Sequence, residues 1–391
     1  MDGERLMEQR IQAAVRIRQG FAAVASRPEV FTSELYEDFF TANPRYRRFV
    51  IADADRRHIR TMEVVTRIVD GLDRPGTLLP YLRRLALEYR KYGVREVHYR
   101  AFAGSVMTAL ERTIGQAWTY EAAEAWVDEL TMVASAMLGI AAEADAQGPP
   151  YWEAEVVSVD RMAQEIVCLR ARPVEGSVPY AYKAGQYAAV EVGRLPWVWR
   201  DFSFATAPRI GGDGRVTLEF HVQRSANGQV TTVIHDELEP GDRIRVAAPE
   251  GDLTFPDGTG RLIAVAHGTG IAPIAALLEE AVATGDTRPI HLIVGASSQL
   301  SPEQAAGHYL SEYLEELATA HGAVGITYAG QAQSLAETLS AYAAELTAPD
   351  GVTLHGWGGI AVGSTATVQA CLEVLAAAGA DPADLRSDLF G

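Results

Sequence analysis

The chain has 391 residues, too many for a single hydrophobic core, so we expect two or three domains. The formal net charge is −17, with −1 on residues 1–147 and −16 on the rest, which argues against nucleic acid as a partner. Cys168 and Cys371 are too few and too scattered for a disulfide framework or a cysteine metal site, and a cytoplasmic location is expected. The charged amino terminus is unlike a signal peptide, and glycines interrupt the apolar stretch 262–278, so no membrane partner is expected.

The first third of the chain is predicted to be helical throughout. Apolar residues recur there at spacings of three and four, as in 101–110 and 126–137. Helix-breaking residues divide the region into segments of helix length, at Pro28, Pro44, Pro75 and Gly93. We therefore expect an all-α domain over residues 1–147.

A different pattern follows the Gly-Pro-Pro break at 148–150. Apolar and polar residues alternate in 155–159 and 216–222, and turn residues recur at short intervals. This alternation is typical of strands with one buried face. It predicts an antiparallel β-barrel over residues 148–258.

The pattern changes again near Arg261. The uninterrupted apolar run 262–266 is followed by a glycine turn and a helix-like segment, and further pairs of strand and helix start at 290–294 and 359–362. Such alternation of strands and helices predicts a parallel α/β domain that binds a nucleotide, over residues 259–391.

Four short motifs follow one another in the two carboxyl-terminal domains. They are Gly185-Gln186-Tyr187, Arg200-Asp201-Phe202-Ser203, Gly228-Gln229-Val230-Thr231, and the run from His267 to Pro273 that contains Gly268-Thr269-Gly270. Each motif alone is a weak signal, but their order and spacing resemble those of the ferredoxin reductase family. The resemblance implies an enzyme that binds FAD and either NADH or NADPH.

The second motif has the residue types that a flavin needs. An arginine can bind a phosphate with two hydrogen bonds, an aromatic ring can lie against the isoalloxazine, and a hydroxyl can donate to the flavin nitrogen that accepts hydride. Arg200, Phe202 and Ser203 match these roles. Side chains alternate along a strand, so those of Arg200 and Phe202 would point to one face and that of Ser203 to the other. Ser203 could then reach the flavin only through a local distortion of the strand or at a different flavin edge.

The two glycine motifs are expected to bind phosphates. Gly228 to Thr231 would present backbone N–H groups to a pyrophosphate at the start of a helix. Gly268-Thr269-Gly270 lies between a strand and a helix, as a dinucleotide phosphate turn requires. Relatives have a glycine where His267 stands.

The carboxyl-terminal segments complete the predicted nicotinamide site. Gly363 and Ser364 lie in the loop where relatives carry Cys-Gly-Pro-Pro, with Val362 in place of the cysteine. Asp388 and Phe390 match a terminal acid-x-Phe motif, whose ring covers the flavin until nicotinamide displaces it. Ser297 stands where many relatives have arginine for a 2′-phosphate, which favours NADH.

The helical domain resembles the globin domain of flavohaemoglobins over residues 8–146, through spacing more than through any single motif. Tyr36, with the aromatic residues around it and Asn43-Pro44 after it, falls at the distal tyrosine that hydrogen-bonds bound oxygen. Tyr92-Gly93-Val94, His98-Tyr99 and Ala125-Trp126 match further family segments.

The resemblance breaks at the proximal iron ligand, where the family histidine is replaced by Tyr89. Tyr99 matches the tyrosine that orients this ligand, and Glu143 matches the carboxylate of the same set. The domain has only two histidines, and His98 is expected at the surface. The distal register is ambiguous between Arg57 and His58, so His58 is the one plausible imidazole for iron.

Three arrangements remain open at this point. Tyr89 binds haem b iron as a phenolate, which favours ferric iron as in catalase. Alternatively, His58 binds iron from the distal side and Tyr89 stays neutral. In the third arrangement there is no haem, and Tyr89, Tyr99 and Glu143 hydrogen-bond to one another.

The expected function is electron transfer from NAD(P)H through FAD at Ser203 to the haem. The family resemblance implies a small-molecule or gaseous substrate, namely oxygen, nitric oxide or a related species, in a monomer or homodimer. The tyrosine at position 89 argues against efficient nitric oxide dioxygenation, which needs ferrous iron, and favours a peroxide-directed or specialised oxidation. The alternative is a haem-free globin that senses a ligand or docks a partner on an NAD(P)H reductase. A plain NAD(P)H oxidase whose globin only covers the flavin is the third possibility.

Overall fold

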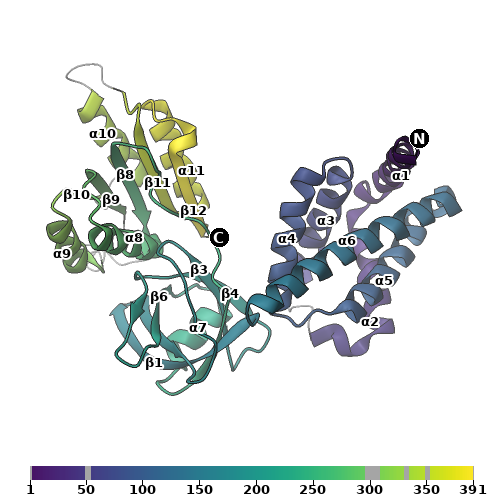
Figure 1. Ribbon diagram of the computed structural model, residues 1–391, viewed down its shortest axis with the longest axis horizontal. Coiled ribbons are helices and arrows are strands. Elements are labelled where there is room, and N and C mark those ends of the chain that lie inside the picture. The colour runs from purple at the N-terminus through teal and green to yellow at the C-terminus, as the bar shows by residue number, and fades with distance from the viewer. Residues whose placement is uncertain (1, 49–53, 296–308, 330–333, 348–352, 391) are drawn as a thin grey trace. The chain divides into compact units, whose positions relative to one another are not determined.

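The computed structural model describes residues 2–48, 54–295, 309–329, 334–347 and 353–390. The chain forms two compact units, Met1–Pro150 and Tyr151–Gly391. The first unit contains helices only, within the residues described, and the second contains two β-sheets with their covering helices (Figure 1).

The helical unit has six α-helices in its described residues, joined by short turns and two 3-10 segments. They are α1 (Asp2–Ala25), α2 (Pro28–Ala42), α3 (Ala54–Gly71), α4 (Pro75–Arg90), α5 (Glu96–Ile114) and α6 (Tyr120–Gln147), with η1 (Pro44–Arg48) and η2 (Gly115–Ala117). Pro28 and Pro75 stand at the first positions of α2 and α4, where a proline needs no amide partner and its fixed φ suits a helix. The prolines used as breaks in the sequence therefore start helices.

Two apolar clusters hold the helices together. The larger surrounds Trp126 and Phe31, which are almost fully buried, and joins α1, α2, α3, α5 and α6. The smaller joins α3, α4 and α6 through Leu82, Leu85 and Met137, and two tyrosines, Tyr89 and Tyr99, pack against it. The predicted all-α region is confirmed.

Helix α6 is long and apolar enough to cross a membrane by length and composition, and among the described helices it alone passes that test. In the structure α6 packs against α1, α4 and α5, with Ala125, Trp126, Val133 and Met137 buried. The apolar stretch 262–278 instead forms a strand, a turn and a buried helix of the second unit.

The second unit begins with an antiparallel sheet of seven strands in the order β4-β3-β7-β1-β2-β6-β5. The strands are β1 (Tyr151–Ala163), β2 (Ile166–Pro173), β3 (Tyr187–Val192), β4 (Trp199–Ser203), β5 (Arg209–Ile210), β6 (Val216–Gln223) and β7 (Arg243–Ala247). A bridge between Phe204 and Phe220 brings the end of β4 to β6 and closes the barrel. Helix α7 (Gln229–Asp236) plugs the barrel with Val230, Val233 and Ile234.

The rest of the unit is a parallel five-stranded sheet in the order β10-β9-β8-β11-β12. Its strands are β8 (Arg261–His267), β9 (Ile290–Gly295), β10 (Val324–Tyr328), β11 (Trp357–Ser364) and β12 (Leu385–Phe390). Helices α8 (Ile271–Thr284) and α9 (Ser311–His321) cover one face, and α10 (Leu335–Thr347) and α11 (Thr365–Ala377) cover the other (Figure 1). The predicted order of all-α, antiparallel β and parallel α/β regions is confirmed.

Candidate functional sites

The ends of β4 and β12 meet in the second unit. The hydroxyl of Ser203, the last residue of β4, donates a hydrogen bond to the carboxylate of Asp388 on β12. Ser203 also lies opposite Tyr187 in the β3–β4 ladder. The structure thus brings together three residues that the sequence analysis assigned from three separate motifs.

Acidic groups dominate this junction. Burial raises the pKa of Asp388, and the nearby carboxylate of Asp201 raises it further, while the Ser203 hydrogen bond acts in the opposite direction. Burial also raises the pKa of Tyr187, whose hydroxyl lies 3.4 Å from the Oε2 of Glu250. A raised pKa keeps a proton on Asp388 at higher pH than on an ordinary aspartic acid.

The loop before β3 is held by its own backbone. Gly185 has a φ of +81°, and a Cβ there would lie 2.1 Å from the carbonyl oxygen of Leu253. Gln186 accepts from the amide of Lys183 at 2.9 Å and donates to the Gly251 carbonyl at 3.1 Å. Gln186, predicted to bind the cofactor, thus supports the loop that presents Tyr187.

Two members of the second motif lie apart from this junction. Arg200 is exposed, and its Nη1 donates to the carbonyl of Trp199 at 2.8 Å. Phe202 is partly buried and packs against the barrel core, with its ring centroid 6.4 Å from that of Phe220. Because adjacent strand residues face opposite sides, Ser203 reaches Asp388 while Phe202 faces the core, and no distortion is needed.

The third motif starts helix α7. Gly228 caps this helix, and the Thr231 hydroxyl donates to its carbonyl oxygen at 2.9 Å. Gln229 is exposed, whereas the Val230 side chain is buried in the barrel core. Val230 can therefore contribute to phosphate binding only through its backbone.

The fourth motif and the loop after β11 make close backbone contacts. A Cβ on Gly270 would lie 2.5 Å from the Val362 carbonyl oxygen, and one on Gly363 would lie 2.8 Å from the Cβ of His267. Such approaches require glycine. Gly268, Thr269 and Gly270 form a 3-10 turn (η3, Gly268–Gly270) between β8 and α8, as a phosphate-binding turn requires.

The parallel register brings the carboxyl-terminal motifs together. Val362 pairs with Asp388, and Ser364 pairs with Phe390, so the predicted nicotinamide loop and the terminal aromatic residue lie side by side. Phe390 is partly buried, and the Ser364 hydroxyl lies 2.8 Å from that of Thr367. Ser297, used to distinguish NADH from NADPH, lies outside the described residues.

In the helical unit, Tyr36 lies between α2 and α3. Its hydroxyl is 2.6 Å from the Oγ1 of Thr61, and the guanidinium of Arg57 lies over its ring at 5.0 Å. The Nε of Arg57 is buried and has no hydrogen-bond partner within the described part of the chain. His58 instead turns to α2, with its Nδ1 2.6 Å from the Oγ1 of Thr32.

Tyr89, near the end of α4, packs with Tyr99 against the smaller apolar cluster. Burial raises the pKa of Tyr89 far above its ordinary value, and Glu88, Tyr99, Tyr36 and Tyr81 raise it further. Burial also raises the pKa of Tyr99, to about 12. Tyr89 is therefore a neutral phenol unless a cation lies beside it.

Glu143, in contrast, does not join these tyrosines. The residues of α6 that contact the smaller cluster are Val133, Ala136, Met137 and Ile140, and the next position on this stripe is Ala144. Glu143 lies beside the stripe and is exposed. The structure thus brings Tyr89 and Tyr99 to one cluster, while the role of Glu143 beside them stays a prediction.

A cavity of about 560 Å³ opens between α3 and α4. Apolar and aromatic side chains such as Met62, Leu78 and Tyr81 form part of its wall, and Arg67 and Arg74 lie at it as well. Arg67 also lies over the Tyr81 ring at 5.1 Å. Glu63 and Asp70 line it too, and the Oε1 of Glu63 lies 3.3 Å from the Nε of Arg67, so the wall carries charges of both signs.

Arg57 and Thr61 were missed as site residues. The ambiguous register allowed Arg57, but only the imidazole of His58 was assigned a role. Thr61 follows Arg57 by one helical turn, so it faces the same side. This spacing was the available signal, and it needed the start of α3 to be known.

Comparisons with known proteins agree with this architecture. The family model of the oxidoreductase FAD-binding domain matches residues 156–255. Flavohemoproteins from Bordetella parapertussis and Bacillus subtilis are 25% and 24% identical, and the matches cover 74% and 76% of this chain and 74% of each relative. A crystal structure of flavohemoglobin from Malassezia yamatoensis with bound FAD and heme has the same fold, with a TM-score of 0.75 and 18% identity over 97% of this chain and 98% of the other.

Proposed function

The chain belongs to the flavohaemoglobin family, and from this premise we propose that it is an NAD(P)H-dependent oxidoreductase whose FAD passes electrons to a globin haem. Its substrate is oxygen, nitric oxide or a related small species. The contact between Ser203 and Asp388 carries the reductase part of this proposal, because it joins the FAD-binding barrel to the last strand of the nicotinamide domain.

The residues at the junction fit a flavin. Tyr187 and Phe390 are partly exposed aromatic rings, and the Ser203 hydroxyl lies with them at the same edge. Gly228 and Thr231 shape a helix start that suits the pyrophosphate. Bound FAD supplies the chemistry of accepting hydride and releasing single electrons.

Asp388 controls the proton on Ser203. A serine hydroxyl has one proton, which it donates to Asp388 when that carboxylate is ionised. A protonated Asp388 would instead donate to Ser203 Oγ and leave the serine proton free to reach the flavin. The raised pKa of Asp388 favours this second state.

The helical unit fits a haem whose iron is held by Tyr89. A phenolate needs a neighbouring cation in this buried place, and ferric iron is a suitable hard cation. His58 already lies against Thr32, which favours Tyr89 over His58 as the ligand.

The absorption spectrum of the purified full-length protein, with haem and FAD quantified separately, tests the haem part. We expect about one haem per chain in the wild type and a phenolate-to-iron charge-transfer band that Tyr89→Phe abolishes. Tyr81→Phe is the matched control, because Tyr81 lines the cavity and packs against the same cluster.

An unchanged band in Tyr89→Phe would overturn the assignment of Tyr89. Flavin bands alone, after haem has been offered during expression, would favour a haem-free globin that senses a ligand or docks a partner. The reductase part has a separate readout, the reduction of bound FAD by NADH or NADPH, and it would survive either result.

The partners and the location of the protein can be proposed from its charge and its cysteines. We propose a small-molecule or gaseous substrate, no nucleic-acid or membrane partner, and a monomer or homodimer. The net charge of −17 disfavours nucleic acid. Both cysteines are buried and free, as suits a reducing cytoplasm.

A further inference from the structure

A cysteine, a carboxylate and an imidazole converge on the outer face of the barrel, on the strand that the Phe204–Phe220 bridge joins to the end of β4. Cys168 on β2 pairs with His221 on β6, and Glu219 follows two residues earlier on β6. Side chains two residues apart on a strand face the same side, and these alternate with core residues such as Leu169 and Phe220. All three residues are buried.

Their polar atoms are spaced as metal ligands are. One atom from each of Cys168, Glu219 and His221 lies within 4.8 Å of the other two. The Nε2 of His221 is 3.3 Å from the Oε1 of Glu219, longer than the 2.7–2.9 Å typical of a charged hydrogen bond. Two ligands at about 2.0 Å from a tetrahedral ion lie about 3.3 Å apart.

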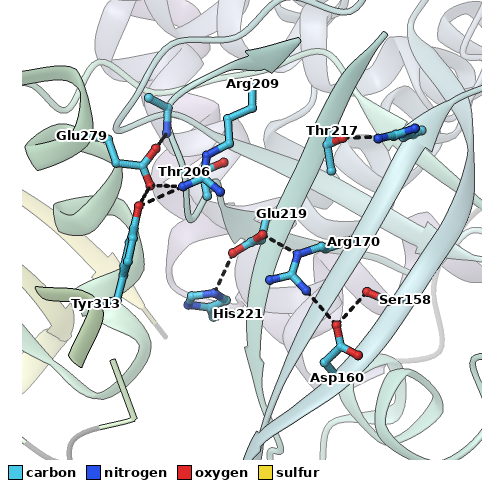
Figure 2. A network of polar contacts seen from close by, with 12 residues as sticks. Ser158, Asp160, Arg170, Thr206, Arg209, Thr217, Glu219, His221, Glu279 and Tyr313 are labelled. Carbon is cyan, nitrogen blue, oxygen red and sulfur yellow. Dashed lines mark hydrogen bonds and ion pairs between the residues drawn. The ribbon is translucent and has the colours of Figure 1, made fainter. Parts of the chain in front are cut away.

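The second polar atom of Glu219 and that of His221, which would not bind the metal, already have hydrogen-bond partners that orient these side chains. Arg170 Nε donates to the Oε2 of Glu219 at 2.6 Å, which leaves Oε1 directed to the cluster (Figure 2). The Nδ1 of His221 lies 3.1 Å from the hydroxyl of Tyr309. A metal-bound histidine usually hydrogen-bonds through its second nitrogen in this way, which fixes the ring.

The charges around the cluster balance with a divalent cation. A thiolate at Cys168 and a carboxylate at Glu219 would neutralise the ion. Arg170 is compensated by Asp160, whose Oδ2 lies 2.7 Å from its Nη1 (Figure 2). A buried group of charges is tolerated when each is paired and hydrogen-bonded.

We propose that Cys168, Glu219 and His221 bind a divalent transition-metal ion of the zinc class. Sulfur, imidazole and carboxylate ligands in a tetrahedral arrangement are typical of zinc. Through Tyr309 the site links the barrel to the nicotinamide domain.

Zinc titration of the full-length, flavin-loaded protein, after treatment with a chelator, tests the proposal. We expect one zinc per chain and a zinc–sulfur distance of about 2.3 Å by X-ray absorption. Cys168→Ser should lose the sulfur signal and weaken binding at least about 100-fold, because a serine hydroxyl is a far poorer ligand at this pH. Cys371→Ser is the matched control, because Cys371 is equally buried but lies in the core between α11 and the parallel sheet.

Tyr309→Phe gives a second test that leaves all three ligands in place. It should weaken zinc binding roughly 10- to 100-fold, as loss of an outer partner of a ligating histidine does. If Cys168→Ser fails to retain flavin, this variant carries the test. Zinc bound without sulfur, equal affinity in the Cys168→Ser and Cys371→Ser variants, or no zinc at one equivalent would each overturn the proposal.

Discussion

The two units build their sites in different ways. In the reductase unit the loops that carry the motifs depend on close backbone approaches, such as Gly270 against Val362 and Gly185 against Leu253. In the helical unit the site consists of side chains on three helices, with Tyr36, Arg57 and Tyr89 as its polar members. A site formed by close backbone approaches requires glycine at fixed positions, so it is visible as a sequence motif. A site formed by side chains can change its chemistry when one residue is replaced.

This contrast explains why the reductase motifs match their family in order and spacing while the globin matches mainly in its pattern of helices. The replacement at Tyr89 leaves α4 and its packing intact, since Tyr89 lies against the apolar cluster that Leu82 and Leu85 help to form. The fold of a globin is therefore a weaker guide to iron chemistry than the fold of a flavin domain is to flavin chemistry.

The largest expected effect is that of Ser203→Ala. Loss of the hydroxyl that contacts Asp388, and that we propose acts on the flavin, should slow FAD reduction by NADH roughly 10²- to 10³-fold, as loss of a placed donor does elsewhere. Stopped-flow absorbance at the flavin band measures it. Ser177→Ala, in an exposed loop of the same barrel, should leave the rate unchanged. Equal rates in the two variants would remove Ser203 from the reaction.

Gly270→Ala tests whether the reductase site depends on the backbone. Its Cβ would meet the Val362 carbonyl, so the turn must shift, at a cost of about 1–3 kcal/mol in the free energy of unfolding. Thermal unfolding and the KM for NADH should both worsen. Gly260→Ala in the same domain has open space around its Cβ and serves as the control. A Gly270→Ala protein as stable as this control would contradict the contrast between the units.

Arg57→Gln tests the side-chain site. The guanidinium over Tyr36 should favour anions that bind ferric haem, so its loss should weaken fluoride or azide binding roughly 10-fold. Spectroscopic titration of the haem-loaded protein measures this affinity. Arg60→Gln, exposed on the same helix, should leave the affinity as it is. Similar anion affinities in both variants would mean that Arg57 does not act on the ligand.

The smallest effect concerns pH. The pKa of Asp388 lies above its ordinary value, so the carboxyl holds its proton to higher pH and loses it as the pH rises through that raised pKa. FAD reduction in the wild type should therefore slow several-fold on going from acid to neutral pH. Asp388→Asn, which cannot ionise, should flatten the profile, with Asp384→Asn as the control. A profile that keeps its slope in Asp388→Asn would assign it to another group.

Much of the fold could be predicted, because the periodicity of apolar residues changes at 147–150 and again near Arg261. The prolines also placed the starts of α2 and α4 closely. The length of α6, which runs from Tyr120 to Gln147 and is apolar enough to cross a membrane by composition, was not predicted from the sequence.

The candidate site residues could be predicted only where they belong to a short sequence motif. Spacing placed Ser203, Asp388, Tyr36 and Tyr89, but it did not show that Phe202 faces the core or that Glu143 lies beside its stripe. Small rotations about a helix or strand decide such cases. The contact of Cys168 with Glu219 and His221 depends on the pairing of β2 with β6, so the argument from cysteine number alone could not reveal it.

Arg90, next to Tyr89, ties the end of α4 to the end of the helical unit. Its Nε donates to the Oδ1 of Asp145 at 2.8 Å, and its Nη2 donates to the Gly148 carbonyl at 2.6 Å. Only 8% of its side chain is exposed. These contacts hold the end of α6 and Gly148 against the end of α4. A globin fragment cut before Asp145 would leave this guanidinium largely buried without either acceptor, whereas a fragment that ends at Pro150 would keep both.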